Sequence, residues 1–177
     1  MHISHKTDSL SSAPAVVIFG CGNVLLGDDG FGPAVITRLL ENNLPSSVLA
    51  VDVGTGIREY LLDYLMLPEL RPSMLIVVDV DVEGVGSPGE VRMCSPNDLP
   101  ARKIHDFSLH QFPTVNLLQE LQEATGVTVA VLLARPPVPV DGFALELSPE
   151  IRAAVEPACQ QICRLIAPFV PRETAQS

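Results

Sequence analysis

Continuous apolar runs alternate with amphipathic stretches along most of this chain. Runs with the length and composition of buried or edge β-strands occur at residues 15–19, 48–53, 74–80, 90–94 and 127–134. Stretches with apolar residues at helical spacing begin near residues 32, 57, 113 and 149. The last of these has a strong start signal, because Ser148 can cap a helix whose first residue is Pro149.

This alternation predicts an α/β fold, a single three-layer αβα domain with a mostly parallel twisted sheet of about five strands flanked by helices. The domain is expected to span residues 15–170. The polar, serine-rich residues 1–14 are predicted to be a disordered N-terminal tail, and residues 171–177 a C-terminal tail. Open sheets of this kind bind ligands beyond the carboxyl ends of their strands, and we expect the functional site there.

The overall charge narrows the choice of partner. The chain carries 21 acidic and 11 basic side chains, a formal net charge of −10, and it has no Trp and only two Tyr. Such a chain repels phosphate backbones and anionic lipids and offers few rings on which bases could stack. No run approaches the roughly 18 apolar residues that a membrane span requires. We therefore expect neither nucleic acid nor membrane as a partner, and a cytoplasmic location.

Three acidic residues, Asp29, Asp52 and Asp79, stand at or just after strands whose carboxyl ends should share one edge of the sheet. Asp79 lies in the most apolar run, where a carboxylate is costly unless it is paired, hydrogen-bonded or metal-bound, so a functional role is favoured. Asp52 opens a D-V-G-T-G sequence and could equally serve a turn. Asp28 is interpreted as a cap for the helix that follows it.

His110 lies in the stretch Asp106-Phe-Ser-Leu-His-Gln-Phe112, just before a predicted helix. Its imidazole could join the carboxylates in a nitrogen and oxygen site for a divalent transition metal. The residues alone leave open whether there is a metal, and whether it would be resident or brought by a substrate.

A glycine-rich loop extends from Gly20 to Gly32, after the first strand and before the first helix, as in dinucleotide-binding proteins. The fingerprint fails, because Leu25 stands at the third glycine position and two acids occupy the place of the pyrophosphate. We expect no nucleotide cofactor.

Three cysteines have positions that suggest chemistry. Cys21 lies in the glycine-rich loop and could be a nucleophile, but neighbouring carboxylates would not stabilise a thiolate, so we predict a packing role. Cys159 and Cys163 lie four residues apart on the last helix and are predicted to pack in the core rather than bind a metal.

The sequence Gly20-Cys-Gly-Asn-Val-Leu-Leu-Gly-Asp-Asp-Gly-Phe-Gly32 resembles the G-x-G-N-x-L-x-x-D-(D/E)-x-x-G signature of the nickel–iron hydrogenase maturation endopeptidases. Its ending is most similar to the subgroup that serves deazaflavin-reducing hydrogenases. Further segments resemble later motifs of that family in the same order: Asp52-Val-Gly-Thr55, Ile76-Val-Val-Asp79, Ser108-Leu-His-Gln111 and Leu147-Ser-Pro149. Together they cover residues 15 to about 168.

The resemblance implies an aspartic-type endopeptidase that removes the C-terminal extension of a hydrogenase large-subunit precursor. It implies that Asp29, Asp79 and His110 bind nickel already loaded in that substrate, and that Asp29 and Asp79 are catalytic. It also implies a set of supporting loop residues: Gly20, Gly22, Asn23, Asp52, Gly54 and Thr55. The alternatives are a metal-dependent amidase or peptidase that owns its ion, and a non-enzymatic nickel or hydrogenase chaperone.

Overall fold

The computed structural model describes residues 13–82, 85–99, 114–137 and 143–170 of the 177-residue chain. Nearly all of the predicted N-terminal tail and the whole of the predicted C-terminal tail lie outside these residues, as does His110. Within the described ranges, no helix is long and apolar enough to cross a membrane.

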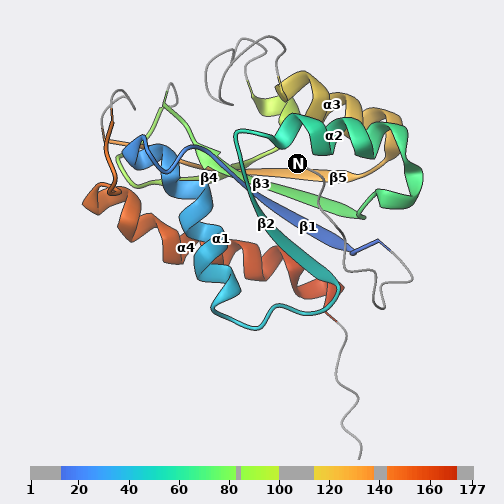
Figure 1. The fold of residues 1–177 in the computed structure, drawn as a ribbon, viewed down its shortest axis with the longest axis horizontal. Helices are drawn as coiled ribbons and strands as arrows, with labels where there is room; N and C mark the ends of the chain where they lie inside the picture. Colours follow the sequence, from blue (N-terminus) through green and yellow to red (C-terminus); the bar gives the residue numbers. More distant parts are fainter. Residues whose placement is uncertain (1–12, 83–84, 100–113, 138–142, 171–177) are drawn as a thin grey trace, which may run out of the picture.

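A five-stranded sheet forms the middle of the molecule (Figure 1). Its strands are β1 (Val16–Cys21), β2 (Val48–Gly54), β3 (Met74–Val80), β4 (Val91–Cys94) and β5 (Thr128–Ala134). Their order in the sheet is β2-β1-β3-β5-β4. All neighbouring pairs are parallel except β4 with β5, so the short β4 forms an antiparallel edge, and the predicted strand positions are confirmed.

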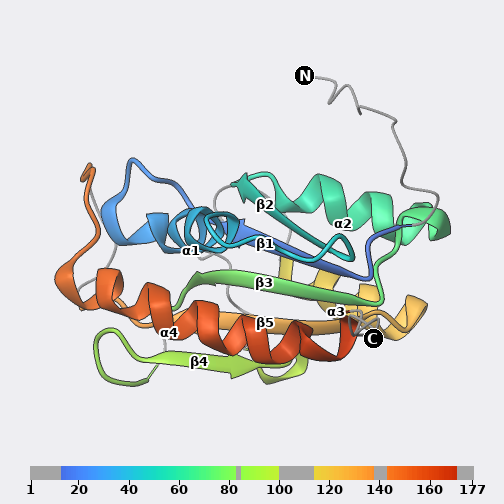
Figure 2. The same cartoon turned by 90° about the horizontal axis from the view of Figure 1, so that it is seen from below.

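In the part of the chain that the structure describes, four α-helices cover the two faces of the sheet (Figures 1 and 2). They are α1 (Phe31–Leu40), α2 (Ile57–Met66), α3 (Thr114–Thr125) and α4 (Pro149–Ile166). Buried side chains of α1 and α4 pack in one core cluster, and those of α2 and α3 pack in a second cluster on the opposite face. The three-layer αβα fold predicted from the sequence is therefore confirmed.

The central strand β3 supplies both clusters. Every one of its residues is buried, and alternate side chains point to opposite faces. Ile76 and Val78 belong to the α1/α4 cluster, whereas Leu75 and Val77 belong to the α2/α3 cluster. A strand buried on both faces needs an almost continuously apolar sequence, which is why the polar Asp79 stands out in it.

The three parallel strands β1, β2 and β3 end at the same edge of the sheet. Gly20 of β1 is in register with Asp52 of β2 and with Val78 of β3. The loops that follow these strands therefore begin side by side, and they carry the acids singled out in the sequence. This carboxyl edge is where the site is built.

Candidate active site

Asp79 is the penultimate residue of β3 and its side chain is only 1% exposed. Its Oδ1 accepts a hydrogen bond from the backbone N–H of Val80 at 2.7 Å. Burying a carboxylate costs free energy that a well-packed apolar residue at this position would not incur. A buried carboxylate next to the exposed loops of the carboxyl edge is typical of a functional residue.

Asp29 is held in the loop between β1 and α1. Its Oδ2 accepts a hydrogen bond from the backbone N–H of Asn23 at 2.6 Å, which closes the loop on itself. Gly22 has φ +123°, and a Cβ there would lie 1.8 Å from the carbonyl oxygen of Asp29. Only glycine can therefore occupy this position, and its absence of a side chain lets the loop bring Asp29 close to the end of β1.

Gly20 and Gly32, at the two ends of this motif, serve packing. A Cβ at Gly32 would lie 2.2 Å from the carbonyl oxygen of Cys21, and one at Gly20 would lie 2.6 Å from the carbonyl oxygen of Gly32. The first turn of α1 therefore rests directly on the backbone of β1. This close contact fixes the direction in which the loop carrying Asp29 leaves the sheet.

Asp52 has the turn role that its sequence context allowed. Its side-chain Oδ1 accepts a hydrogen bond from the backbone N–H of Gly54 at 2.9 Å, and the residue is exposed. The carbonyl of Gly54 in turn accepts a hydrogen bond from the N–H of Gly22 at 3.0 Å, which ties this turn to the loop after β1. Thr55 lies exposed in the same turn.

The thiol of Cys21, at the end of β1, is buried in a region of negative charge. Its pKa is raised well above the usual value, first by burial and then by the negative charges of Asp79, Asp29 and Asp52. The strand register agrees with this, because Gly20, the residue before Cys21, is in register with Asp52 of β2 and with Val78 of β3, the residue before Asp79. That the acids act together in one site stays a prediction. A thiol held in its protonated form is a poor nucleophile, in line with the predicted packing role.

The metal-binding half of the prediction rests partly on His110, which lies outside the described residues. In the described part of the chain, no three His, Cys, Asp or Glu side chains are grouped closely enough to hold one ion. Any metal site at this edge would therefore need ligands beyond the described acids.

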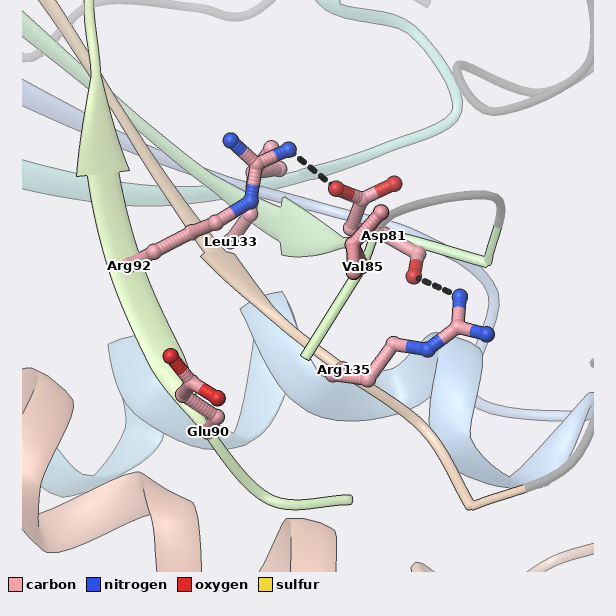
Figure 3. A pocket seen from close by; sticks show the side chains of 6 residues that line it. All are labelled: Asp81, Val85, Glu90, Arg92, Leu133 and Arg135. Atoms are coloured by element: carbon pink, nitrogen blue, oxygen red, sulfur yellow. Dashed lines mark hydrogen bonds and ion pairs between the residues drawn. The ribbon is translucent and has the colours of Figure 1, made fainter. Parts of the chain in front are cut away.

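An ion pair beside Asp79 was not anticipated from the sequence. Asp81, two residues further along, is buried and its carboxylate accepts a charge-assisted hydrogen bond from Arg92 of β4 (Figure 3). Arg135 donates to the backbone carbonyls of Asp81, at 2.9 Å, and Val82. Arg92 reaches Asp81 because both Arg92 of β4 and Asp79 of β3 are in register with Leu133 of β5, and Asp81 follows the end of β3 by one residue.

The prediction for Asp28 was wrong in its partner. Neither the short 3-10 helix at Gly27–Gly30 nor α1 receives a side-chain cap. The Oδ1 of Asp28 instead accepts a hydrogen bond from the backbone N–H of Ser148 at 2.6 Å. Ser148 itself caps α4 as predicted, because its hydroxyl accepts from the N–H of Ile151.

The expectation for the cysteines of α4 is half correct. Cys159 is buried against α1, whereas Cys163, one turn later, is exposed. Residues four apart on a helix are offset by about 40°, which is enough to move the second thiol out of the core.

Fold and site together define a class of protein: an α/β domain whose acids converge at the carboxyl edge of a parallel sheet. The sequence model of the hydrogenase maturation proteases matches residues 33–165. The chain is 32% identical over 152 residues to coenzyme F420 hydrogenase subunit delta of Methanothermobacter thermautotrophicus, covering 83% of this chain and 91% of that protein. It is 30% identical over 146 residues to the hydrogenase 3 maturation protease of Escherichia coli, covering 82% and 87%.

A solved structure has the same fold. The nickel–iron hydrogenase maturation protease HycI of Thermococcus kodakarensis superposes with a TM-score of 0.69 at 25% identity, over 89% of this chain and 95% of that one. The chain therefore belongs to the hydrogenase maturation protease family. It is a hydrogenase maturation endopeptidase, as the motifs from Gly20 to Pro149 indicated.

Proposed function

We propose that this endopeptidase removes the C-terminal extension of a nickel-loaded hydrogenase large-subunit precursor, using Asp29, Asp79 and His110. The observation that carries the proposal is the burial of Asp79 near the end of β3, next to strand β1, whose following loop holds Asp29. A carboxylate near the end of one strand and another in the loop after the neighbouring strand can together bind a cation that neither would hold alone.

Nickel is part of the substrate in this proposal. The precursor presents nickel near its C-terminal extension, and two carboxylates with one imidazole complete the coordination of the ion. Coordination then fixes the scissile bond beside the acids, which lowers the entropic cost of reaching the transition state. A precursor without nickel lacks this bridge and is not cut.

Asp29 and Asp79 act as the acid and base groups, which makes the enzyme aspartic in type. A carboxylate within hydrogen-bond reach of a water molecule can orient it and take its proton as it attacks the peptide carbonyl. The nickel ion can polarise that carbonyl as a Lewis acid. Asp52 stabilises the adjoining turn and takes no direct part.

The expected setting is the cytoplasm, where large-subunit precursors would be processed before assembly. The similarity to a subunit of a coenzyme F420 hydrogenase supports a precursor of that hydrogenase class as the first candidate. Nucleic acid and membranes remain excluded as partners in this proposal, because the net charge of −10 opposes both.

The test is mass spectrometry of candidate precursors incubated with the protein, with and without nickel. We expect the wild-type protein to shorten only the nickel-loaded precursor. Asp79→Asn and His110→Ala should reduce the processing rate by at least about a thousandfold, because each substitution removes a nickel ligand. The circular dichroism spectra of both variants should match that of the wild type, which shows that they fold. Asp52→Asn, which keeps a turn acceptor, serves as the matched control and should process at a similar rate.

Four outcomes would contradict the proposal. Processing of the nickel-free precursor at the normal rate would remove nickel from recognition. Normal activity of Asp79→Asn would exclude this carboxylate from the site. Stoichiometric nickel in the purified protein would favour a resident ion, and an intact C-terminus after incubation would favour a nickel carrier.

A further inference from the structure

An exposed apolar surface lies beside the loop that carries Asp29. It consists of Val24 and Leu25 from that loop and of Phe143 and Leu145 from the segment that leads into α4, and we call it the apolar ledge. Phe143 is 73% exposed, Leu145 69% and Leu25 47%. In Figures 1 and 2 these two segments lie side by side at one end of the sheet. Contiguous apolar surface of this kind on a folded domain usually marks a site of interaction.

The ledge is held in shape by backbone hydrogen bonds between its two segments. Ala144, which separates Phe143 from Leu145, donates to the carbonyl of Leu25 at 3.0 Å and accepts from the N–H of Gly27 at 2.7 Å. Leu26 and Ala144 form a parallel bridge. A surface fixed in this way loses little conformational entropy when it is covered, which favours binding.

The same loop joins the ledge to the acids. Val24 and Leu25 stand between Asn23 and Asp29, and the 2.6 Å hydrogen bond from the N–H of Asn23 to the Asp29 carboxylate closes that loop. The ledge and Asp29 therefore share one loop, and a polypeptide bound at Asp29 comes close to these two side chains.

We infer that the apolar ledge is the docking surface for the precursor protein on which the enzyme acts. The inference rests on the proposed function, because it takes its occupant from the reaction proposed for the neighbouring acids. A small substrate would need only the acids, whereas a protein substrate buries apolar surface around them. The occupant is thus a polypeptide with exposed apolar side chains near its cleavage site.

The experiment compares two double variants. Leu25→Ser with Leu145→Ser removes apolar surface from the ledge. Leu49→Ser with Leu40→Ser is the matched control, since these leucines are 46% and 59% exposed on β2 and at the end of α1. Processing of nickel-loaded precursor is measured as a function of precursor concentration. Binding of the same precursors is measured by biolayer interferometry, and folding by thermal unfolding.

We expect the ledge variant to raise KM at least about tenfold with kcat within about twofold, because docking energy is lost equally from the ground state and the transition state. Precursor binding should weaken by the same factor, and the control variant should behave as the wild type. Equal KM for the ledge variant and the wild type would overturn the inference and leave the proposed function intact. Equal weakening of both variants would also overturn it, because the effect would not be specific to the ledge.

Two further results separate the inference from the proposed function. If the wild-type protein binds a precursor without cutting it, and only the ledge variant loses binding, the docking surface stands and the proposed reaction fails. If the wild-type protein is a dimer in sedimentation velocity and the ledge variant a monomer, the ledge is covered by a second copy and the inference is overturned.

Discussion

The acids at this sheet edge differ in role because each has different neighbours. Asp28 and Asp29 are adjacent in sequence, yet the first binds the start of α4 and the second closes its own loop. Asp52 holds a turn, and Asp79 lies buried in β3. Three of these acids nevertheless act on the same group, because the negative charges of Asp29, Asp52 and Asp79 all raise the pKa of the Cys21 thiol.

The raised pKa of Cys21 predicts slow alkylation. At pH 8 the thiol is almost entirely protonated, and since only the thiolate reacts, its labelling should accelerate as the pH rises. With iodoacetamide, we expect the exposed Cys163 to be modified at least about a hundredfold faster than Cys21, measured by peptide mapping. The buried Cys159, with a pKa of about 11, should also be slow. Rapid labelling of Cys21 at neutral pH would revive a thiol mechanism.

A companion variant tests the same thiol in the reaction. Cys21→Ser should retain processing activity within about threefold, because the residue packs in the α2/α3 cluster and supplies no nucleophile. Precursor processing under saturating substrate measures this. Complete loss of activity in a folded Cys21→Ser protein would contradict the packing role.

Single residues could be predicted where their partners are local in sequence. The turn role of Asp52 and the cap at Ser148 were accessible, because their hydrogen-bond partners lie two and three residues away. The partner of Asp28 lies 120 residues away, and no local pattern encodes it. The pairing of Asp81 with Arg92 required knowledge that β4 adds to the sheet beside β5.

At the scale of elements, the exit of β3 is held by its neighbours. The N–H of Asp81 donates to the carbonyl of Ala134 in β5 at 2.8 Å, and Arg135 binds the carbonyls that follow. Arg92 of β4 adds the ion pair to the Asp81 side chain, which in turn raises the pKa of the guanidinium. Because that pKa is raised from an already high value, Arg92 stays charged throughout the neutral range and would lose its charge only in strong alkali.

Removal of Arg92 should therefore destabilise the fold. Arg92→Ala takes away a partner of the buried Asp81 carboxylate, and we expect a loss of about 2 kcal/mol in the free energy of unfolding, less than for a fully buried pair since Arg92 is partly exposed. Arg152→Ala breaks an exposed pair with Glu146 and should cost at most about 0.5 kcal/mol. Urea titration followed by circular dichroism measures both. Equal costs would show that the Asp81 pair is no stronger than a surface pair.

The apolar pattern of the sequence predicted where strands and helices lie, but it did not always predict the residue at which each one ends. The run at 74–80 coincides with β3, because it is apolar almost throughout and ends in turn residues. β1 continues two residues beyond the apolar run, to Cys21, since the backbone of Gly20 still pairs with both neighbouring strands. Helix α4 likewise continues through Pro157, which lies exposed where its missing N–H leaves a carbonyl facing water.

At the scale of the whole molecule, two core clusters share a single sheet. The α1/α4 cluster and the α2/α3 cluster lie on opposite faces and meet only through the strands. Strand β3 pairs with β1 on one side and β5 on the other, and its apolar side chains alternate between the two clusters. Loss of either cluster would expose that shared strand, and we therefore expect the domain to unfold as one unit.

Adjacent valines of β3 allow a matched test of this unity. Val77 packs toward α2/α3 and Val78 toward α1/α4, and both are fully buried. Val77→Ala and Val78→Ala should each cost about 2 kcal/mol. In both variants, the urea transition seen by far-ultraviolet circular dichroism should coincide with that of tyrosine fluorescence, which reports α2 through Tyr60 and Tyr64. Two separate transitions in either variant would show that the faces unfold independently.

The overall architecture was predictable because stretches with strand periodicity alternate clearly with stretches of helical periodicity. Connections between parallel strands are almost always right-handed, which leaves few possible topologies. The apolar ledge was not predictable, because it depends on a contact between residues 25–27 and Ala144. A sequence pattern shows which residues are apolar, but only the folded chain shows which of them remain uncovered together.

The bond between Asp28 and Ser148 has a consequence for motion. The N–H of Ser148 donates to the carboxylate of Asp28, the residue before Asp29, so its hydrogen can exchange with deuterium only when this hydrogen bond opens. Hydrogen exchange at Ser148 would therefore time the opening of the loop that carries Asp29. If a bound precursor closes this loop, the protection of the Ser148 amide from exchange should rise with the fraction of protein that has precursor bound. Exchange at a residue that takes no part in catalysis would then measure how often the loop opens.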